Sequence, residues 1–182
     1  MNRHIFLTGE KQVGKSTLLH RVIESLQLCP AGFRTLPFDV GGERKGYVLH
    51  SLVPLPPFEN DCPVVVRMGE RKPVPVLPVY ETIGISILEK SLLIPSPVLL
   101  MDELGKAERD APCFLNAVRR CLDSEKCILG VIQQGEYPLF AEIAARPDIQ
   151  IILVTKENRE ALFPILTDAV RQLLGLVDLP VS

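Results

Sequence analysis

The sequence predicts an α/β protein in which a mostly parallel β-sheet is covered by helices on both faces. Two observations lead to this prediction. Short apolar runs alternate with segments of helical periodicity along most of the chain, an order typical of parallel strands joined by crossover helices. Between residues 32 and 78 the pattern changes to β-prone stretches separated by glycines and prolines, which predicts an antiparallel hairpin extension at one side of the sheet.

The first part of the chain predicts a strand, a turn, a helix and a hairpin, in that order. The apolar run from His4 to Leu7 indicates a buried strand that ends at Thr8. Apolar residues at positions 18, 19, 22, 23 and 26 follow helical spacing, and the Cys-Pro-Ala-Gly sequence at 29–32 ends this helix. The pair Gly41-Gly42 predicts the hairpin turn, and short strands are expected at residues 64–66 and 74–77.

From residue 81 onward the chain returns to alternating helices and strands. The run from Val98 to Met101 is continuously apolar, as expected of a central parallel strand, and it leads directly to Asp102 and Glu103. Helices are also expected at residues 81–93, 112–122, 137–145 and 158–174, and strands at residues 127–132 and 149–154. No repeat or linker interrupts this order, so residues 1–182 are predicted to form a single domain.

Composition and charge weigh against several classes of function. The formal net charge is -2 and no long run of Lys and Arg occurs, which argues against nucleic acid as a partner. The chain contains no stretch of 18 apolar residues and no signal-peptide core, so no membrane partner is expected and a cytoplasmic location is predicted. The five cysteines include no C-x-x-C pair, which favours reduced thiols over disulfides or a zinc site.

Residues Gly9 to Ser16 fit the pattern G-x-x-x-x-G-K-[ST] at every constrained position, between a predicted strand and a predicted helix. Glycines let such a loop curl so that its N–H groups point at a β-phosphate, and the helix start adds a positive dipole end. We expect Lys15 to reach the β- and γ-phosphates and Ser16 to ligate Mg²⁺. The alternative is a glycine turn that binds nothing. The predicted nucleotide-binding residues are Gly9, Glu10, Lys11, Gln12, Val13, Gly14, Lys15, Ser16 and Thr17.

The acidic pair Asp102-Glu103 fits the companion motif, an apolar strand that ends in an acid. Asp102 is expected beside the P-loop, where it would hold Mg²⁺ directly or through water. Glu103 would orient and polarise the water that attacks the γ-phosphate, which makes Glu103 and Lys15 the predicted catalytic residues. The alternatives are an ordinary acidic turn for Asp102 and a helix N-terminal acid for Glu103.

With these motifs in place, nearly the whole chain resembles the small P-loop family called cancer-related or thermophile-type nucleoside triphosphatases. The resemblance implies a three-layer P-loop NTPase sandwich with a RecA-like sheet, and slow Mg²⁺-dependent hydrolysis of several nucleoside triphosphates. It carries over Lys15, Ser16, Thr17, Asp102 and Glu103 as the active site. The chain departs from the family pattern at residues 36–38 and 67–83, so substrate contacts there are not carried over. The matching segments are Leu7 to Thr17, Gly32-Phe33-Arg34-Thr35, Arg44-Lys45-Gly46-Tyr47, Asp102-Glu103-Leu104-Gly105-Lys106 and Val154-Thr155-Lys156-Glu157-Asn158-Arg159.

The sequence Thr155-Lys156-Glu157-Asn158 resembles the T-K-x-D guanine-binding motif, with asparagine in place of aspartate. An amide offers one acceptor and one donor, whereas a carboxylate accepts from both guanine N–H groups, so strong guanine preference is not expected. Asn158 is therefore predicted to contact the base, and its alternative role is to cap the last helix. Gln133 is a candidate sensor of the γ-phosphate, with a solvated strand end as the alternative. Arg34, Arg44 and Arg159 are candidates for stabilising transition-state charge, and surface ion pairs are their alternative role.

The predicted function is hydrolysis of nucleoside triphosphates such as ATP and GTP, with release of orthophosphate. Two alternatives stay open. A P-loop kinase usually carries an arginine-rich lid, and no local arginine cluster follows the later strands. A GTPase-like switch would use Asp102 to Gly105 as a D-x-x-G motif, but the guanine-binding motif is imperfect. The sequence indicates no particular protein partner.

Overall fold

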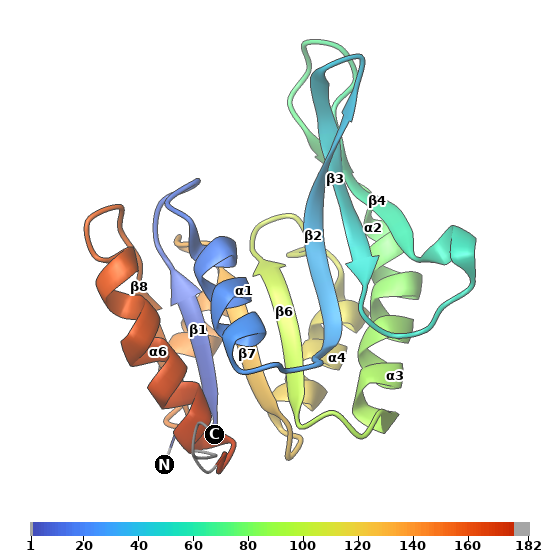
Figure 1. The fold of residues 1–182 in the computed structure, drawn as a ribbon. Helices are drawn as coiled ribbons and strands as arrows, with labels where there is room; N and C mark the ends of the chain where they lie inside the picture. The colour runs from blue at the N-terminus through green and yellow to red at the C-terminus, as the bar shows by residue number, and fades with distance from the viewer. Residues whose placement is uncertain (1, 177–182) are drawn as a thin grey trace.

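The computed structural model describes residues 2–176, which form one eight-stranded mixed sheet with helices packed on both faces (Figure 1). The strands are β1 (His4–Thr8), β2 (Ala31–Val40), β3 (Glu43–Ser51), β4 (Asp61–Val66), β5 (Val74–Pro75), β6 (Val98–Leu104), β7 (Cys127–Ile132) and β8 (Ile149–Leu153). The helical segments are α1 (Lys15–Ser25), η1 (Pro57–Glu59), α2 (Leu77–Val79), η2 (Tyr80–Gly84), α3 (Ile85–Leu93), α4 (Pro112–Leu122), α5 (Pro138–Ala145) and α6 (Arg159–Leu173).

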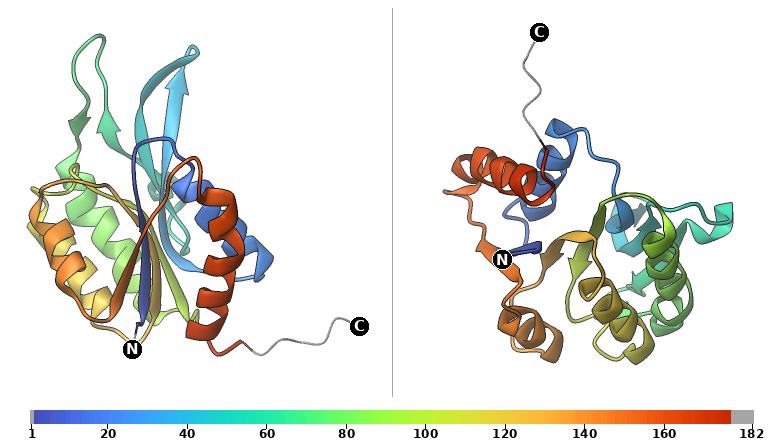
Figure 2. Two further views of the ribbon diagram at one scale, coloured as in Figure 1. Left: turned by 90° about the vertical axis from the view of Figure 1, so that its left-hand side faces the viewer. Right: turned by 90° about the horizontal axis from the view of Figure 1, so that it is seen from below.

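The strand order is β5-β4-β3-β2-β6-β7-β1-β8. Strands β2, β6, β7, β1 and β8 are neighbours in that order and pair in parallel. Strands β2, β3, β4 and β5 are also neighbours in that order and pair antiparallel. This arrangement confirms the predicted fold class, a mostly parallel sheet with an antiparallel extension. Helices α1 and α6 cover one face of the sheet and α3, α4 and α5 cover the other, as the view from below shows (Figure 2).

The central strands are apolar on both faces because each face packs against helices. In β1, Ile5 and Leu7 belong to the core under α1 and α6, whereas Phe6 belongs to the core under α3, α4 and α5. In β6, Leu100 likewise belongs to the core under α1 and α6, and Met101 belongs to the core under α3, α4 and α5. The continuous apolar runs that predicted these strands therefore reflect a sheet buried on both sides.

The structure corrects two predicted boundaries. Strand β6 continues to Leu104, so Asp102 and Glu103 lie within the strand, and the alternative role of Glu103 as a helix N-terminal acid is wrong. The helix expected at residues 81–93 begins at Leu77 and passes through a π-helical turn, η2, before α3. Pro78 lies in the first turn of that helix, where a missing N–H costs nothing, and the preceding strand shrinks to Val74–Pro75.

The antiparallel extension forms an arm that projects past the carboxyl ends of the parallel strands (Figure 1). Only Ala31 to Arg34 of β2 pair with β6, and the rest of β2 runs outward with β3. The loop between β4 and β5 projects in the same direction (Figure 2). Within residues 2–176, no helix has both the length and the hydropathy that a membrane span requires. All five cysteines are free thiols in the structure.

Candidate nucleotide-binding and catalytic site

The loop between β1 and α1 has the backbone conformation that its two glycines allow. Gly9 and Gly14 have φ angles of 137° and 97°, in the region that disfavours a side chain. A Cβ on Gly9 would also collide with the carbonyl oxygen of Val154, at the end of β8. Gly14 is the N-cap of α1, so the loop feeds directly into the positive end of that helix.

The side chain of Lys15 folds back over this loop. Its Nζ donates hydrogen bonds to the carbonyl oxygens of Gly9 at 3.0 Å and Glu10 at 2.7 Å, and the residue is only 7% exposed. Val13 packs in the core between the sheet and α1, so the loop offers its backbone rather than its side chain to a ligand. The loop therefore places a buried ammonium group next to backbone N–H groups, a combination that suits phosphate binding.

The hydroxyl of Ser16 and the carboxylate of Asp102 come together from α1 and β6. Ser16 Oγ donates to Asp102 Oδ1 at 2.6 Å, and Asp102 is 2% exposed. A hydroxyl and a carboxylate are the oxygen ligands that Mg²⁺ accepts, and it takes its remaining ligands from water and substrate phosphates. These two residues fit a Mg²⁺ ion held mainly by substrate. Within residues 2–176 no cluster of three His, Cys, Asp or Glu side chains could form a larger metal cage.

Glu103 lines a cavity of about 310 Å³ together with the P-loop. Burial raises the pKa of the Glu103 carboxyl above its ordinary value, although the Lys15 ammonium acts in the opposite direction. The backbone of Glu103 is fixed by Thr35 of β2, whose Oγ1 accepts a hydrogen bond from the Glu103 N–H at 3.2 Å. The residues that line the cavity are Gly9, Glu10, Lys11, Lys15, Glu103, Lys106, Gln133 and Gln134.

Residues of the two loops that follow β6 and β7 also line the cavity. Gln133 is one of them, and its side-chain amide forms a hydrogen bond with Glu103 that lowers the carboxyl pKa. Gln133 therefore lies where a sensor of the γ-phosphate was expected, within reach of the candidate base. The cavity brings together a cationic loop, a carboxylate and an amide, which is an arrangement suited to activating water against a bound phosphate.

A family described as NTPase matches residues 4–167. The chain belongs to this family. The resemblance inferred from its sequence motifs is thereby confirmed, and the protein is a nucleoside triphosphatase by family.

This NTPase has curated relatives of nearly equal length. It is 35% identical to the human protein named cancer-related nucleoside-triphosphatase, over 90% of this chain and 94% of that protein. It is 30% identical to the Thermotoga maritima protein named nucleoside-triphosphatase THEP1, over 87% of this chain and 90% of the relative. The crystal structure of THEP1 from Aquifex aeolicus matches with a TM-score of 0.71 at 24% identity, covering 90% of this chain and 96% of that one, and it supports the fold.

The side chain of Asn158 forms hydrogen bonds to the backbone just before it in the chain. Its side-chain oxygen accepts a hydrogen bond from the Thr155 N–H at 2.8 Å, and its NH₂ group donates to the Leu153 carbonyl at 3.0 Å. Asn158 occupies the N-cap position of α6, as its alternative role predicted, although its side chain makes no capping hydrogen bond. Contact between Asn158 and a nucleotide base stays a prediction.

None of the three candidate arginines lines the cavity of the NTPase. Arg44 pairs with Asp39 on the exposed arm. Arg159 pairs with Glu160 at 3.5 Å, and its side chain lies against Gly14 of the P-loop. Arg34 lies beside Asp102 in the strand register, with its Nε buried and without a hydrogen-bond partner in the described part of the chain. The surface ion pairs expected as alternatives for Arg44 and Arg159 are therefore present.

Sequence reasoning missed His20 and the role of Thr35. His20 Nε2 lies 3.2 Å from Asp102 Oδ2, so the second oxygen of this carboxylate also has a partner. Its spacing carried a signal, because residues four apart on a helix share one face and His20 follows Ser16 by four. Thr35 belongs to a strand distant in sequence from Glu103, and only the parallel pairing of β2 with β6 brings them together.

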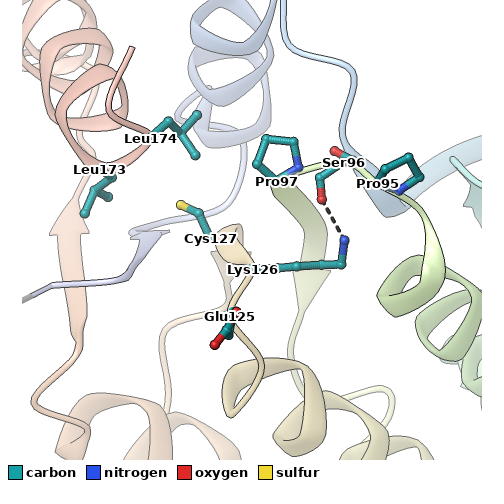
Figure 3. Close-up of a pocket in the computed structure, with 8 residues that line it drawn as sticks. All are labelled: Pro95, Ser96, Pro97, Glu125, Lys126, Cys127, Leu173 and Leu174. Carbon is teal, nitrogen blue, oxygen red and sulfur yellow. Dashed lines mark hydrogen bonds between the residues drawn. The ribbon is translucent and has the colours of Figure 1, made fainter. Parts of the chain in front are cut away.

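A second cavity, of about 420 Å³, lies at the other end of the parallel strands, where β6 and β7 begin (Figure 3). The ammonium group of Lys126 extends toward Ser96 and donates to the carbonyl oxygens of Ser96 at 2.7 Å and Ile94 at 2.6 Å, so its hydrogen bonds are to the protein itself. In parallel α/β sheets ligands bind at the carboxyl ends of the strands. The candidate site of the NTPase is therefore the cavity at the P-loop.

Proposed function

We propose that this NTPase hydrolyses nucleoside triphosphates of several bases in a slow, Mg²⁺-dependent reaction that releases orthophosphate. The observation that carries the proposal is the convergence of Ser16, Asp102 and Glu103 next to the Lys15 ammonium. The five free thiols, two of them exposed, support a reducing compartment such as the cytoplasm.

The proposed reaction assigns each part of the cavity a task. The N–H groups of the loop from Gly9 to Gly14 bind the β-phosphate, and the Lys15 ammonium contacts the β- and γ-oxygens. Ser16 and Asp102 hold Mg²⁺, which when bound neutralises charge on the phosphate oxygens. Glu103 accepts a proton from a water whose oxygen attacks the γ-phosphorus, while the bond from that phosphorus to the bridging oxygen breaks. The products are orthophosphate and a nucleoside diphosphate.

Broad base use and slow turnover have separate structural support. The amide of Asn158 is engaged with Thr155 and Leu153, and no carboxylate stands at that position to accept from guanine. The cavity contains no arginine among its described lining residues, and an arginine finger contributes a factor of about 10³–10⁵ to kcat in GTPases. Glu103 favours water as the acceptor over the hydroxyl of a kinase substrate.

The test is orthophosphate release from ATP, GTP, CTP and UTP, each with Mg²⁺ and with EDTA. We expect release from all four with Mg²⁺ and none with EDTA. Glu103→Gln should lower kcat by about 10²-fold or more while still binding a fluorescent ATP analogue, because only the base is removed. Lys15→Ala should lose both binding and release. Glu125→Gln, an exposed change at the second cavity, is the matched control and should leave nucleotide binding and orthophosphate release unchanged.

Three results would contradict the proposal. Normal release by Glu103→Gln would remove this residue from the reaction. Release that appears only when a small-molecule acceptor is added would indicate a kinase. Turnover restricted to GTP would indicate a GTPase-like switch instead of an NTPase with broad base use.

A further inference from the structure

Lys106, in the loop that follows β6, lines the cavity together with the P-loop. This loop contains Gly105, whose N–H donates a hydrogen bond to the buried carboxyl group of Glu108. The N–H of Lys106 lies 3.4 Å from Gln133 Oε1 on the neighbouring loop. The backbone that carries Lys106 is therefore anchored on both sides, and both anchors lie beside Glu103.

Two glycines lie where the loops that follow β6 and β7 pack together. A Cβ on Gly105 would collide with the side chain of Gln133, so the absence of a side chain at Gly105 lets Gln133 approach this loop closely. A Cβ on Gly135 would lie 3.2 Å from Lys106 Cε and 3.6 Å from Lys106 Nζ. The end of the Lys106 side chain therefore lies against Gly135, and Lys106 lines the cavity from there.

The charge of Lys106 is not neutralised by a neighbouring side chain. Within residues 2–176 no carboxylate oxygen lies within 4.0 Å of its Nζ. The other lysines of the cavity, Lys11 and Lys15, both belong to the P-loop. Lys106 is thus the lysine that lines the cavity from outside the P-loop, and a cation there can meet the charge that develops as the γ-phosphoryl group is transferred.

We propose that Lys106 is a catalytic residue that contacts the γ-phosphoryl oxygens in the transition state, in the position that an arginine finger takes in other P-loop enzymes. This inference rests on the proposed hydrolysis. A lysine offers a single charged point where an arginine offers a planar fork of donors, so it stabilises the spread charge of a phosphoryl group less well. Slow turnover is the expected consequence.

The test compares Lys106→Met and Lys106→Arg with the wild type, with Lys72→Met, an exposed change in the loop between β4 and β5 that does not line the cavity, as the control. Lys106→Met should lower kcat for MgATP by about 10²-fold, because one preorganised cation is lost from the transition state. Its KM should stay within about threefold of the wild type, since the ground state gains little from this contact. Lys106→Arg should keep most of the activity or exceed it.

A binding measurement separates this role from a structural one. The affinity for MgADP with aluminium fluoride, which mimics the transferring phosphoryl group, should fall in Lys106→Met by about the factor lost in kcat, while MgADP alone binds equally well. An unchanged kcat in Lys106→Met, or an equal loss of kcat in Lys72→Met, would overturn the proposal. If the wild type releases no orthophosphate, the proposed hydrolysis fails, and equal analogue affinities in wild type and Lys106→Met would separately refute the role of Lys106.

Discussion

The Nε2 atom of His20 lies 3.2 Å from Oδ2 of Asp102, whose other oxygen accepts a hydrogen bond from Ser16 at 2.6 Å. His20 and Ser16 are one helical turn apart on α1, so a single helix holds both oxygens of a carboxylate on β6. Asp102 is almost fully buried, and each of its oxygens has a partner. His20 therefore fixes the orientation in which Asp102 faces the P-loop.

Replacing His20 should weaken the response of the enzyme to Mg²⁺. Loss of a partner that orients a ligating carboxylate typically costs about 10–100-fold in metal affinity. We expect His20→Ala to raise the Mg²⁺ concentration for half-maximal orthophosphate release by about tenfold, while His20→Gln, which keeps an N–H donor, recovers part of this loss. The measurement is a Mg²⁺ titration at saturating ATP.

His50 provides the control for the His20 variants. It pairs with Asp61 at 2.7 Å on the antiparallel strands, and it does not line the P-loop cavity. His50→Ala should leave the Mg²⁺ titration unchanged. Identical titrations of wild type and His20→Ala would show that Asp102 keeps its orientation without His20.

The fold could be predicted where the sequence pattern is local. Strand β7 and helix α4 have the bounds that periodicity predicts, because each is delimited by a change from apolar to polar residues or by a proline. The start of the α2–η2–α3 segment was missed because Pro78 resembles a strand breaker in sequence, whereas in three dimensions it lies in the first turn of a helix.

The candidate site could be predicted where one motif supplies it. The P-loop pattern identifies Lys15 and Ser16 because its residues are contiguous, and the acidic end of an apolar strand identifies Asp102. The positions of Thr35 and Lys106 depend on strand register and on the packing of two loops, which no local pattern contains. The hydrogen bonds of Asn158 depend in the same way on the shape of one turn.

The N-terminus of α4 is capped by a side chain from another segment, and removing that cap should destabilise the protein. The N-cap residue Ala111 has no side-chain acceptor. Instead the carboxylate of Glu81, in η2, accepts hydrogen bonds from the N–H groups of Cys113 at 3.2 Å and Phe114 at 3.3 Å. We expect Glu81→Ala to lower the free energy of unfolding by about 1–2 kcal/mol, as for the loss of an N-cap.

Urea denaturation would measure this loss. Glu89→Ala is the matched control, because Glu89 forms an exposed ion pair with Arg120 and caps no helix. Such surface pairs contribute at most about 1 kcal/mol, so the control should change stability less than Glu81→Ala does. Equal losses of unfolding free energy in the two variants would mean that the hydrogen bonds from Glu81 to α4 contribute no more than an exposed ion pair does.

The buried carboxyl group of Glu108 should make stability fall as pH rises. Burial, with a smaller effect of the Glu103 charge, raises its pKa from 4.5 to about 7. Between these values the folded protein holds a proton that the unfolded chain releases, so stability decreases through this window by about 3 kcal/mol in all. Glu108→Gln keeps an oxygen for the Gly105 N–H and stays neutral. Urea denaturation should therefore find it more stable than the wild type at pH 8, with a smaller gain at pH 5.5. The same pH dependence of stability in the two proteins would contradict this prediction. The exposed change Glu24→Gln is the control and should leave stability unchanged at both pH values.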